Sequence, residues 1–424
     1  MFGYLNPGDK VATTAGTLTI VGSPLVGGEG AGYKATLNGN TVFYKQFTDL
    51  QVLPAGFTSH EAVAKHRHKR TEWLVKAQLN LLNPAFNAPF ASSANPKKPG
   101  YVCSWIDGLT PWSEWREQAH PYGERLTVIG QLTTLLSLLH QQNIAHGDIN
   151  ANNVCILGSG VNLRVVLIDF GNCNDGDPAK RPLMTNDVEH ISPDLFQGKG
   201  VADMQSDLYA LGVMSYEALL VKTIDSGGAN EQDMRQRRAK GAIPGDPLCG
   251  TRKGDEVGLP YDALPPALQT KLRGLTNPEP SQRPKIGYFK LVFDHETAHN
   301  LVLCTVCNKP YFWHVALLSC PCCKAAAVPP ALHVQLPNQV MELRHNMCIG
   351  RDNIPGAPLY FAARQLLIQP AHLGAARIFV TGRNSMKLTQ SNGKKYLMNS
   401  QSGSVDVGPG DVLELEGTRI SFLP

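Results

Sequence analysis

Two short stretches of this chain carry polar side chains whose spacing could do chemistry. The first, HGDINANNV at His146–Val154, places Asp148 five residues before Asn153, and the second, LIDFGN, contains Asp169. An aspartate can orient an attacking hydroxyl and accept its proton, whereas carboxylate and amide oxygens are the ligands that Mg²⁺ prefers. The spacing therefore indicates chemistry on a metal-bound phosphate.

Residues upstream could bind the phosphates themselves. GGEGAGYKA at Gly27–Ala35 predicts a glycine-rich hairpin, in which Gly28, Gly30 and Gly32 let the backbone approach a nucleotide closely. The spacing of these glycines is GxGxG rather than the commoner GxGxxG. Lys45 in VFYK follows on a predicted strand, from which its ammonium could bridge two phosphates.

These residues need a β-rich part and a helical part to bring them together. Up to about residue 100, alternating apolar residues and frequent glycines predict strands, interrupted by one helix over His60–Leu82. From Glu124 the apolar residues repeat at three and four, and Ser206–Leu220 predicts a second, buried helix. AAAVPPALHVQLP at 325–337 predicts a linker, after which the pattern is β-like again. We therefore expect an α+β fold followed by an all-β sandwich.

The order of the motifs resembles that of the eukaryotic-like Ser/Thr protein kinases, over about residues 20–295. The resemblance continues in SPD at Ser192–Asp194, in SDLYALG and in NPEPSQRP. It implies a bilobal fold, in which Asp207 binds the backbone of the catalytic loop and Arg283 pairs with Asp194. The implied activity is transfer of the γ-phosphate of ATP to protein hydroxyls, with Mg²⁺ or Mn²⁺ bound.

The resemblance assigns a role to each candidate residue. Backbone groups of SWIDG at Ser104–Gly108 hold adenine, and either Glu61 or Glu72 pairs with Lys45. Glu72 is favoured because it lies eleven residues before Asn83-Pro84. The implied catalytic residues are Asp148, Lys45, Asn153 and Glu72. The implied nucleotide-binding residues are Gly28, Gly30, Gly32, Lys45, Ser104, Ile106, Asn153 and Asp169, with the metal on Asn153 and Asp169.

Two departures from the family pattern concern control and charge. Gly147 stands where many of these kinases have an Arg that receives a phosphate on the activation loop. The chain is therefore not switched on through that contact, although Thr185 could still be modified. Asn150 replaces a Lys near the γ-phosphate, and an amide cannot neutralise charge.

Two other functions stay open. HGD loops are also typical of small-molecule phosphotransferases of the aminoglycoside-kinase type, and a kinase-like chain can be a non-catalytic scaffold. The SPD and SDLYALG motifs and Arg283 favour a protein substrate. The presence of Lys45, Asp148 and Asp169 favours an active enzyme over a scaffold.

Four cysteines have the spacing of a zinc ribbon. Cys304-x-x-Cys307 and Cys320-x-x-Cys323 could present four sulfurs tetrahedrally to one structural Zn²⁺, with Cys322 as a bystander. Four free buried thiols are the alternative.

A second metal pattern is HETAH at His295–His299, which matches the HExxH of zinc proteases. Thr305 stands where a third His would follow, so a solvated helix end is the better interpretation.

The C-terminal residues 340–424 resemble the forkhead-associated (FHA) fold, a β-sandwich that binds phosphothreonine. Gly350-Arg351, Asn392-Gly393 and Gly410-Asp411 carry the resemblance. Where that family has Ser-x-x-His, this chain has Ala363–Leu366, so the phosphate donors would be Arg351, Arg364 and Asn392. A β-sandwich that docks a protein partner is the alternative.

Composition limits the other possibilities. The chain has 424 residues, which predicts two to four domains, and a net charge of +4, which gives little reason to expect nucleic acid. Neither a secretory signal nor an apolar run of about 20 residues is visible, and the cysteine cluster favours a cytoplasmic location. We predict a kinase N-lobe (1–107), a C-lobe (108–298), a zinc ribbon (299–328) and an FHA-like sandwich (329–424). Overall similarity to kinases of stress-resistance cassettes implies a von Willebrand A-domain protein and a cognate phosphatase as partners.

Overall fold

The protein is described here by a computed structural model. It describes residues 4–28, 30–48, 53, 54, 56–177, 190–198, 201–221, 259–314, 316–327, 333–336, 339–342, 347–349, 365–370, 376–381, 385–415 and 418–423. The chain divides into two compact units, Met1–Gly258 with Thr270–Lys290, and Leu259–Gln269 with Leu291–Pro424. In the part of the chain so described, no helix combines the length and the apolar character needed to cross a bilayer.

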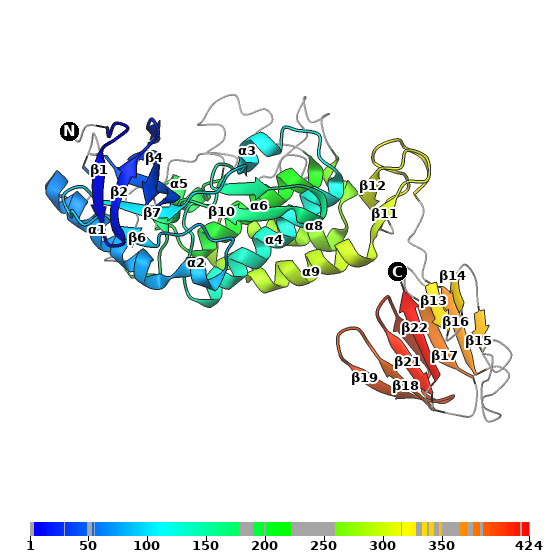
Figure 1. The fold of residues 1–424 in the computed structure, drawn as a ribbon. Coiled ribbons are helices and arrows are strands. Elements are labelled where there is room, and N and C mark those ends of the chain that lie inside the picture. The colour runs from blue at the N-terminus through cyan, green and yellow to red at the C-terminus, as the bar shows by residue number, and fades with distance from the viewer. Residues whose placement is uncertain are drawn as a thin grey trace. The chain divides into compact units, whose positions relative to one another are not determined.

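The first unit begins with a seven-stranded antiparallel sheet (Figure 1). Its strand order is β1-β2-β4-β5-β7-β6, and β3 pairs with β4. Inward side chains alternate with outward ones, which gives the sheet an apolar core that includes Leu18, Tyr33 and Val102. The strands are β1 Lys10–Thr13, β2 Gly16–Ile20, β3 Leu25–Val26, β4 Gly30–Leu37, β5 Asn40–Phe47, β6 Ala91–Ser92 and β7 Gly100–Ser104.

One helix packs against this sheet where a longer one was predicted. The expected helix over His60–Leu82 is two helices, α1 His60–Ala77 and α2 Leu79–Leu82, because Gln78 adopts a left-handed conformation at φ +49°. Ser59 begins α1 by accepting a hydrogen bond from the Ala62 amide. The buried face of α1 is partly polar, because it includes Arg67, Arg70 and Thr71 beside Val63 and Leu74.

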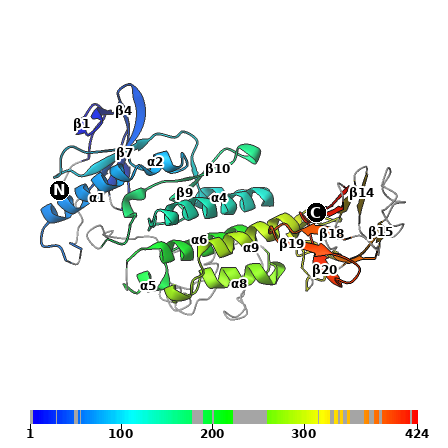
Figure 2. The same ribbon diagram turned by 90° about the horizontal axis from the view of Figure 1, so that it is seen from below.

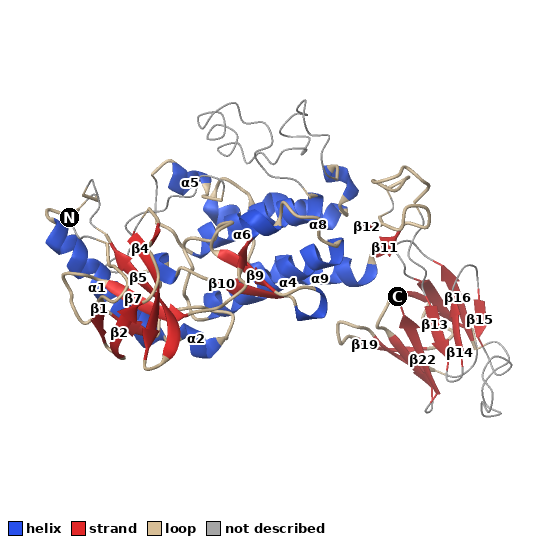
Figure 3. Cartoon of the chain, turned by 45° about the horizontal axis from the view of Figure 1, so that its top comes forward, coloured by secondary structure: helices blue, strands red, loops and turns tan. Residues whose placement is uncertain are grey.

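The helical part of the first unit is built around the helices α4 Tyr122–Gln141 and α6 Met204–Leu220 (Figures 2 and 3). Helices α4 and α6 pack side by side, and α6 is buried from Ser206 to Leu220, as its apolar sequence predicted. A small sheet has the strand order β10-β9-β8. Strand β9 follows the loop that contains Asp148, and β10 precedes the loop that contains Asp169. The elements of the first unit are β8 Thr110–Pro111, α3 Trp112–Trp115, α4 Tyr122–Gln141, β9 Val154–Leu157, η1 Gly160–Asn162, β10 Arg164–Leu167, η2 Phe170–Asn172, α5 Pro193–Phe196, α6 Met204–Leu220 and η6 Pro280–Gln282. The short helix η5 Tyr261–Ala263 belongs to the second unit, and α8 Pro266–Leu275 and α9 Ile286–His299 each contain residues of both units.

The HETAH stretch closes α9, which ends at His299 as predicted. The expectation of a solvated end is wrong for Glu296, which is only 6% exposed and accepts a hydrogen bond from Asn300 Nδ2 at 2.6 Å. The carboxylate therefore binds the side chain of the residue that follows the helix.

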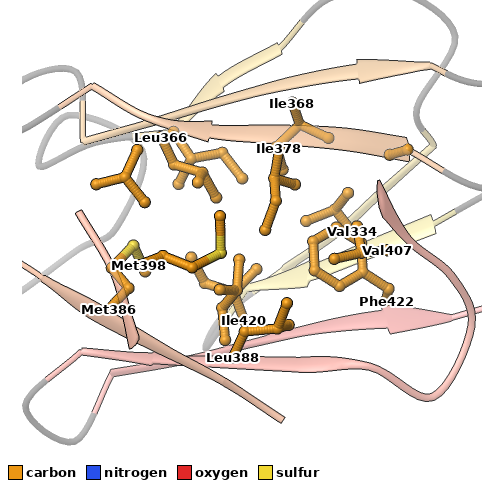
Figure 4. Close-up of a cluster of buried hydrophobic side chains, with 14 of the residues drawn as sticks. Val334, Leu366, Ile368, Ile378, Met386, Leu388, Met398, Val407, Ile420 and Phe422 are labelled. Carbon is orange, nitrogen blue, oxygen red and sulfur yellow. The ribbon is translucent and has the colours of Figure 1, made fainter. Parts of the chain in front are cut away.

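The second unit contains a short hairpin and two further antiparallel sheets. The sheet orders are β14-β13-β22-β21-β18-β19 and β15-β16-β17-β20. Their inner faces share an apolar core in which Ile368 and Ile378 face Leu388 and Ile420 (Figure 4). The strands are β11 Leu301–Leu303, β12 Pro310–Phe312, β13 His333–Leu336, β14 Gln339–Glu342, β15 Met347–Ile349, β16 Leu366–Pro370, β17 Ala376–Val380, β18 Met386–Thr389, β19 Lys395–Met398, β20 Ser404–Val407, β21 Val412–Leu415 and β22 Thr418–Leu423.

The predicted linker at 325–337 is wrong for His333–Leu336, because these residues form β13, in the interior of its sheet. Val334 and Leu336 point into the core, so the segment HVQL is an alternating strand that follows prolines.

Candidate active site

Lys45 and Asp169 meet although 124 residues separate them. Lys45 Nζ lies 2.7 Å from Asp169 Oδ1 and 2.6 Å from Oδ2, and the Tyr101 hydroxyl donates to Oδ1 at 2.9 Å. Lys45 and Tyr101 are register partners on β5 and β7, so both reach Asp169 from one place in the sheet. Burial raises the pKa of Asp169, but the charge and hydrogen bonds of Lys45 and Tyr101 outweigh burial and hold the pKa below its usual range. The carboxylate is therefore ionised at neutral pH.

Asp148 is surrounded by side-chain amides. Asn153 Nδ2 donates to the Asp148 backbone carbonyl at 2.8 Å and to its Oδ2 at 3.1 Å. Asn150 Nδ2 donates to Asp148 Oδ1 at 3.0 Å, and Asn172 Nδ2 donates to Oδ2 at 3.1 Å. Three side-chain amides thus fix the orientation of the Asp148 carboxylate. A further hydrogen bond can reach this carboxylate only from a direction that none of the three amides occupies.

Asn150 also shapes the loop. Its Oδ1 accepts from the backbone amides of Asn152 at 2.9 Å and Asn153 at 3.0 Å, so the side chain closes the turn that carries Asn153. The sequence had singled out Asn150 only for the charge that it lacks. The structure adds a hydrogen-bonding role that Lys, which has no acceptor, could not fill.

Asp207 binds the backbone of the loop at His146–Val154, as predicted. Its Oδ2 accepts from the His146 amide at 2.8 Å and its Oδ1 from the Gly147 amide at 2.9 Å. The His146 ring is buried, which lowers its pKa, and Nε2 lies 3.1 Å from the Ile168 carbonyl. Since a carbonyl only accepts, this nitrogen of the neutral ring carries the proton.

The second predicted contact of the helical part is also present. Arg283 Nη2 donates to Asp194 Oδ1 at 2.9 Å, and Arg283 Nη1 donates to the Gln205 carbonyl at 2.8 Å. The Arg283 side chain is fully buried, so this pair fixes α5 to the start of α6.

A cavity of about 620 Å³ joins the two groups of residues. Its walls come from the glycine-rich hairpin, the strand of Lys45, the SWIDG segment and both polar loops. Among the described residues of its lining, Lys45 is the single cationic side chain, facing two aspartates. Every residue predicted to bind nucleotide lies in this lining: Gly28, Gly30, Gly32, Lys45, Ser104, Ile106, Asn153 and Asp169.

Gly30 and Gly32 are explained by strand packing as well as by the close approach of a ligand. A Cβ at Gly30 would overlap the Gln46 carbonyl of the neighbouring strand, and one at Gly32 would lie 2.6 Å from the Phe43 ring. These glycines let β4 pack against β5, and in doing so they shape the roof of the cavity.

The acidic partner proposed for Lys45 remains a prediction. Glu72 is 46% exposed on its side chain and lies 3.7 Å from His68, while Glu61 is exposed in the first turn of α1. In the structure Lys45 forms an ion pair with Asp169. The buried face of α1 instead carries Arg70, which binds the loop that follows Asp169. Its Nη2 donates to the Gly171 carbonyl at 2.5 Å and to that of Cys173 at 3.1 Å.

The donor set suits Mg²⁺. Asp169 offers an ionised carboxylate, and Asn153 uses its amide nitrogen toward Asp148, which leaves the oxygen as its ligand atom. Oxygen ligands of this kind fit a hard divalent cation. Both side chains line the same cavity, so the residues present are compatible with a bound metal.

The four predicted cysteines form one cluster. Their Sγ atoms all lie within 4.8 Å of one another, with Cys304–Cys323 at 3.5 Å and Cys307–Cys320 at 3.8 Å. Zinc–sulfur bonds of about 2.3 Å in a tetrahedron require sulfur separations of about 3.8 Å, so the cluster fits Zn²⁺. Cys322 is exposed and lies outside the cluster. Hydrogen bonds from the Cys307 and Val306 amides lower the pKa of Cys304 to about 6, whereas burial and the neighbouring thiols raise the pKa of Cys323 to about 12.

The candidate phosphate donors of the C-terminal sandwich are only partly described. Arg351 and Arg364 lie outside the described residues, as does Thr185 of the first unit. Asn392 is exposed in the turn between β18 and β19, where its Oδ1 accepts from the Lys394 amide at 2.9 Å. Asp411 accepts from the Ser391 amide at 2.7 Å, so these later turn residues fix the loops of the sandwich.

Sequence reasoning missed three residues of the site. Tyr101 and Asn172 contact the two aspartates, and Arg70 binds the loop that follows Asp169. The loop of Asp148 contains three asparagines, at 150, 152 and 153, but no pattern in the sequence connects them with Asn172.

Comparison with known proteins agrees with this geometry. Residues 110–295 match the family model of the protein kinase domain. The match begins after the N-terminal sheet, so the glycine-rich hairpin and Lys45 lie outside it. It includes Asp148, Asn153 and Asp169.

The relatives include bacterial proteins that are named as Ser/Thr kinases. The chain is 30% identical to serine/threonine-protein kinase Pkn1 of Myxococcus xanthus over 136 residues, which is 31% of this chain and 19% of the relative. It is 28% identical to the probable serine/threonine-protein kinase PknB of Lactococcus lactis over 123 residues, 28% of this chain and 19% of the relative. It is 33% identical to serine/threonine-protein kinase PknA of Corynebacterium glutamicum over 107 residues, 24% of this chain and 22% of the relative. The chain thus spans about a fifth of the length of these relatives. With the loops and their contacts described above, these matches show that the chain contains a protein kinase domain of mixed helices and sheets.

Proposed function

We propose that the protein is a Ser/Thr protein kinase that transfers the γ-phosphate of ATP to protein hydroxyls with Mg²⁺ bound. One observation carries the proposal: Lys45, from the sheet outside the family match, contacts Asp169 inside the match across one cavity. A phosphate-binding cation and a metal-binding carboxylate are thereby placed together, as phosphoryl transfer requires.

Each residue of the site then has a task. Asp148 orients the substrate hydroxyl. When ATP binds, Lys45 gives up its contact with Asp169 and binds the phosphates instead. Asn153 and Asp169 hold Mg²⁺, which neutralises phosphate charge when bound. The backbone of Ser104 and Ile106 holds adenine at the far side of the cavity.

A protein substrate is favoured over a metabolite by the helical part of the first unit. Arg283 and Asp194 form a buried pair that fixes the SPD segment, and the relatives are named as Ser/Thr kinases. A non-catalytic scaffold is disfavoured because both aspartates and Lys45 line one cavity.

The test uses the full chain with γ-labelled ATP, Mg²⁺ and two generic substrates, casein and myelin basic protein. We expect labelled phosphoserine or phosphothreonine with the wild type, and none with Asp148→Ala. Asp262→Ala removes an exposed carboxylate outside the cavity and is the matched control, with wild-type labelling expected. Equal labelling by Asp148→Ala and wild type would contradict the catalytic role.

We also propose that Cys304, Cys307, Cys320 and Cys323 hold a structural Zn²⁺, in a ribbon over residues 299–328. The fit of the sulfur separations supports this proposal. A reducing compartment such as the cytoplasm would keep these thiols available to metal.

For the remaining parts we propose the kinase lobes at 1–107 and 108–298 and an FHA-like sandwich at 329–424 that docks a protein partner. The two-sheet core supports the sandwich. A von Willebrand A-domain protein and a phosphatase are proposed as partners from sequence similarity alone. Titration of the full chain with phosphothreonine peptides separates phosphopeptide binding from plain docking.

A further inference from the structure

We propose that Asn172 is a positioning residue for Asp148, and that Gly147 is required because it admits Asn172. The inference rests on the proposed kinase function and concerns two residues to which that function gave no role. It also gives the Arg-to-Gly departure in the catalytic loop a structural reason.

Asn172 is built into the site. It ends η2, is only 5% exposed, and donates through Nδ2 to Asp148 Oδ2 at 3.1 Å. Of the three amides on this carboxylate, Asn150 and Asn153 belong to the catalytic loop itself. Asn172 alone of the three comes from the loop of Asp169, so it ties the carboxylate that orients the hydroxyl to the loop that holds the metal.

The backbone register brings Asn172 to this place. Ala145 and Asn174 form an antiparallel bridge, with N–H···O distances of 2.8 Å and 3.0 Å. Continuing this register by two residues on each side sets Gly147 opposite Asn172. The bridge between Ala145 and Asn174 is an isolated one, and beyond it the backbones of Gly147 and Asn172 approach each other closely. From there the Asn172 side chain reaches Asp148.

Gly147 makes the close approach possible. Its φ is +77°, which L side chains rarely adopt, and a Cβ there would overlap the Asn172 carbonyl oxygen. An Arg at this position would have to displace the Asn172 backbone. In many related kinases an Arg at this position receives a phosphate on the activation loop. In this chain Gly147 instead lets the backbones of the two loops approach directly, and this approach needs no phosphate.

Asn172 acts on the reaction through Asp148 and takes no proton itself. In the transfer step the substrate oxygen bonds to the γ-phosphorus, the bond from that phosphorus to the ADP oxygen breaks, and the hydroxyl proton passes to Asp148. A carboxylate held by Asn172 keeps one oxygen directed at the hydroxyl, and this orientation lowers the barrier without altering ATP binding.

The experiment measures kcat and the KM for ATP of the full chain with γ-labelled ATP, Mg²⁺ and casein. Asn172→Ala should lower kcat about 10- to 100-fold and leave the KM for ATP within about 3-fold, as loss of a hydrogen bond to a charged group predicts. Asn172→Asp keeps the shape but replaces the donor by a like charge, so its kcat should be no higher than that of Asn172→Ala.

Controls separate positioning from folding. Gln131→Ala removes a half-buried amide that makes two backbone hydrogen bonds away from the cavity, so it should lower the Tm and keep kcat. Gly158→Ala imposes a matched strain, since Gly158 has φ +74° and a Cβ there would lie 2.9 Å from the Asn162 carbonyl. It should also keep kcat, whereas Gly147→Ala should lower it.

A double-mutant cycle tests the link between the two residues. If Gly147→Ala acts by displacing Asn172, the double variant should lose no more kcat than the worse single variant. Additive losses would overturn the role of Gly147. A wild-type kcat in Asn172→Ala, or its full rescue in Asn172→Asp, would overturn the positioning role while the kinase function stands. A wild type that transfers no phosphate would overturn both.

Discussion

At the scale of single residues, the site relies on buried hydrogen-bond donors that come from outside the motifs. Tyr101 donates to Asp169 beside Lys45, and Arg70 from α1 donates to the carbonyls of Gly171 and Cys173. A guanidinium suits this task because it presents several donors in one plane. Arg70 therefore joins α1 to the loop that follows Asp169, whereas the two acidic candidates on this helix, Glu61 and Glu72, are exposed.

The change Arg70→Ala should lower both stability and rate. It removes donors from the buried carbonyls of Gly171 and Cys173, which costs about 2 kcal/mol of unfolding free energy and loosens the loop that carries Asp169. We expect kcat to fall about 10-fold in the labelled-ATP assay. Lys69→Ala, on the exposed face of the same helix, is the control and should behave as wild type. An unchanged kcat in Arg70→Ala would show that α1 does not position this loop through Arg70.

At the scale of elements, one buried carboxylate connects three parts of the helical region. Glu217 on α6 accepts from Trp112 Nε1 at 2.8 Å and from Arg116 Nη1 at 2.6 Å, and lies 3.6 Å from His190. Burial raises the pKa of Glu217, but His190, Arg116 and Trp112 outweigh burial and lower it below its usual value of 4.5. The carboxylate thus joins α3, α6 and the segment that precedes α5.

Glu217→Gln should destabilise the first unit by about 3 kcal/mol at pH 7, because Arg116 is left without its buried counter-charge. Since the folded-state pKa of Glu217 is depressed, its contribution is complete above about pH 4.5 and is lost as the pH falls through the folded-state value. The difference from wild type should therefore shrink in acid. Tryptophan fluorescence during urea unfolding at pH 7 and below pH 4.5 measures it.

The matched control is Glu117→Gln, because Glu117 is an exposed partner of the same Arg116 at 3.4 Å. A surface ion pair of this kind contributes less than about 1 kcal/mol. Destabilisation of Glu217→Gln that is the same at both pH values would contradict the ionised, paired state of Glu217.

The elements also show what the sequence could and could not predict. The resemblance to protein kinases predicted the contacts of Asp207 and the Arg283–Asp194 pair, because each depends on residues within a recognisable motif. The Asn172–Asp148 contact was not predicted, because it depends on the register between two loops, which no local pattern encodes. Helix periodicity likewise could not show the break at Gln78. The proline-rich composition of 325–337 favoured a linker and hid β13, which begins three residues after Pro330.

At the scale of the whole molecule, the second unit contains a small core around four cysteines whose sulfurs are compatible with zinc. The core around the four cysteines is small and contains Tyr311 and Trp313, which is too little apolar surface to hold a ribbon without a cross-link. A bound Zn²⁺ would supply it.

Metal analysis of the purified chain should find one zinc per molecule. Cys304→Ser should lose the metal, and the fluorescence of Trp313 should change as its small core loosens. Cys322→Ser changes an exposed thiol outside the cluster and should retain one zinc. Full zinc content in Cys304→Ser, or none in the wild type, would contradict the ribbon.

The most direct test of the central claim separates ATP binding from phosphate transfer at Asp148. Asp148→Asn keeps the size of the side chain but removes the carboxylate, so the full chain should still bind ATP with Mg²⁺ in calorimetry. It should transfer γ-phosphate to casein at least about 100-fold more slowly than wild type. Wild-type transfer by Asp148→Asn, or failure of the wild type to bind ATP, would contradict the account.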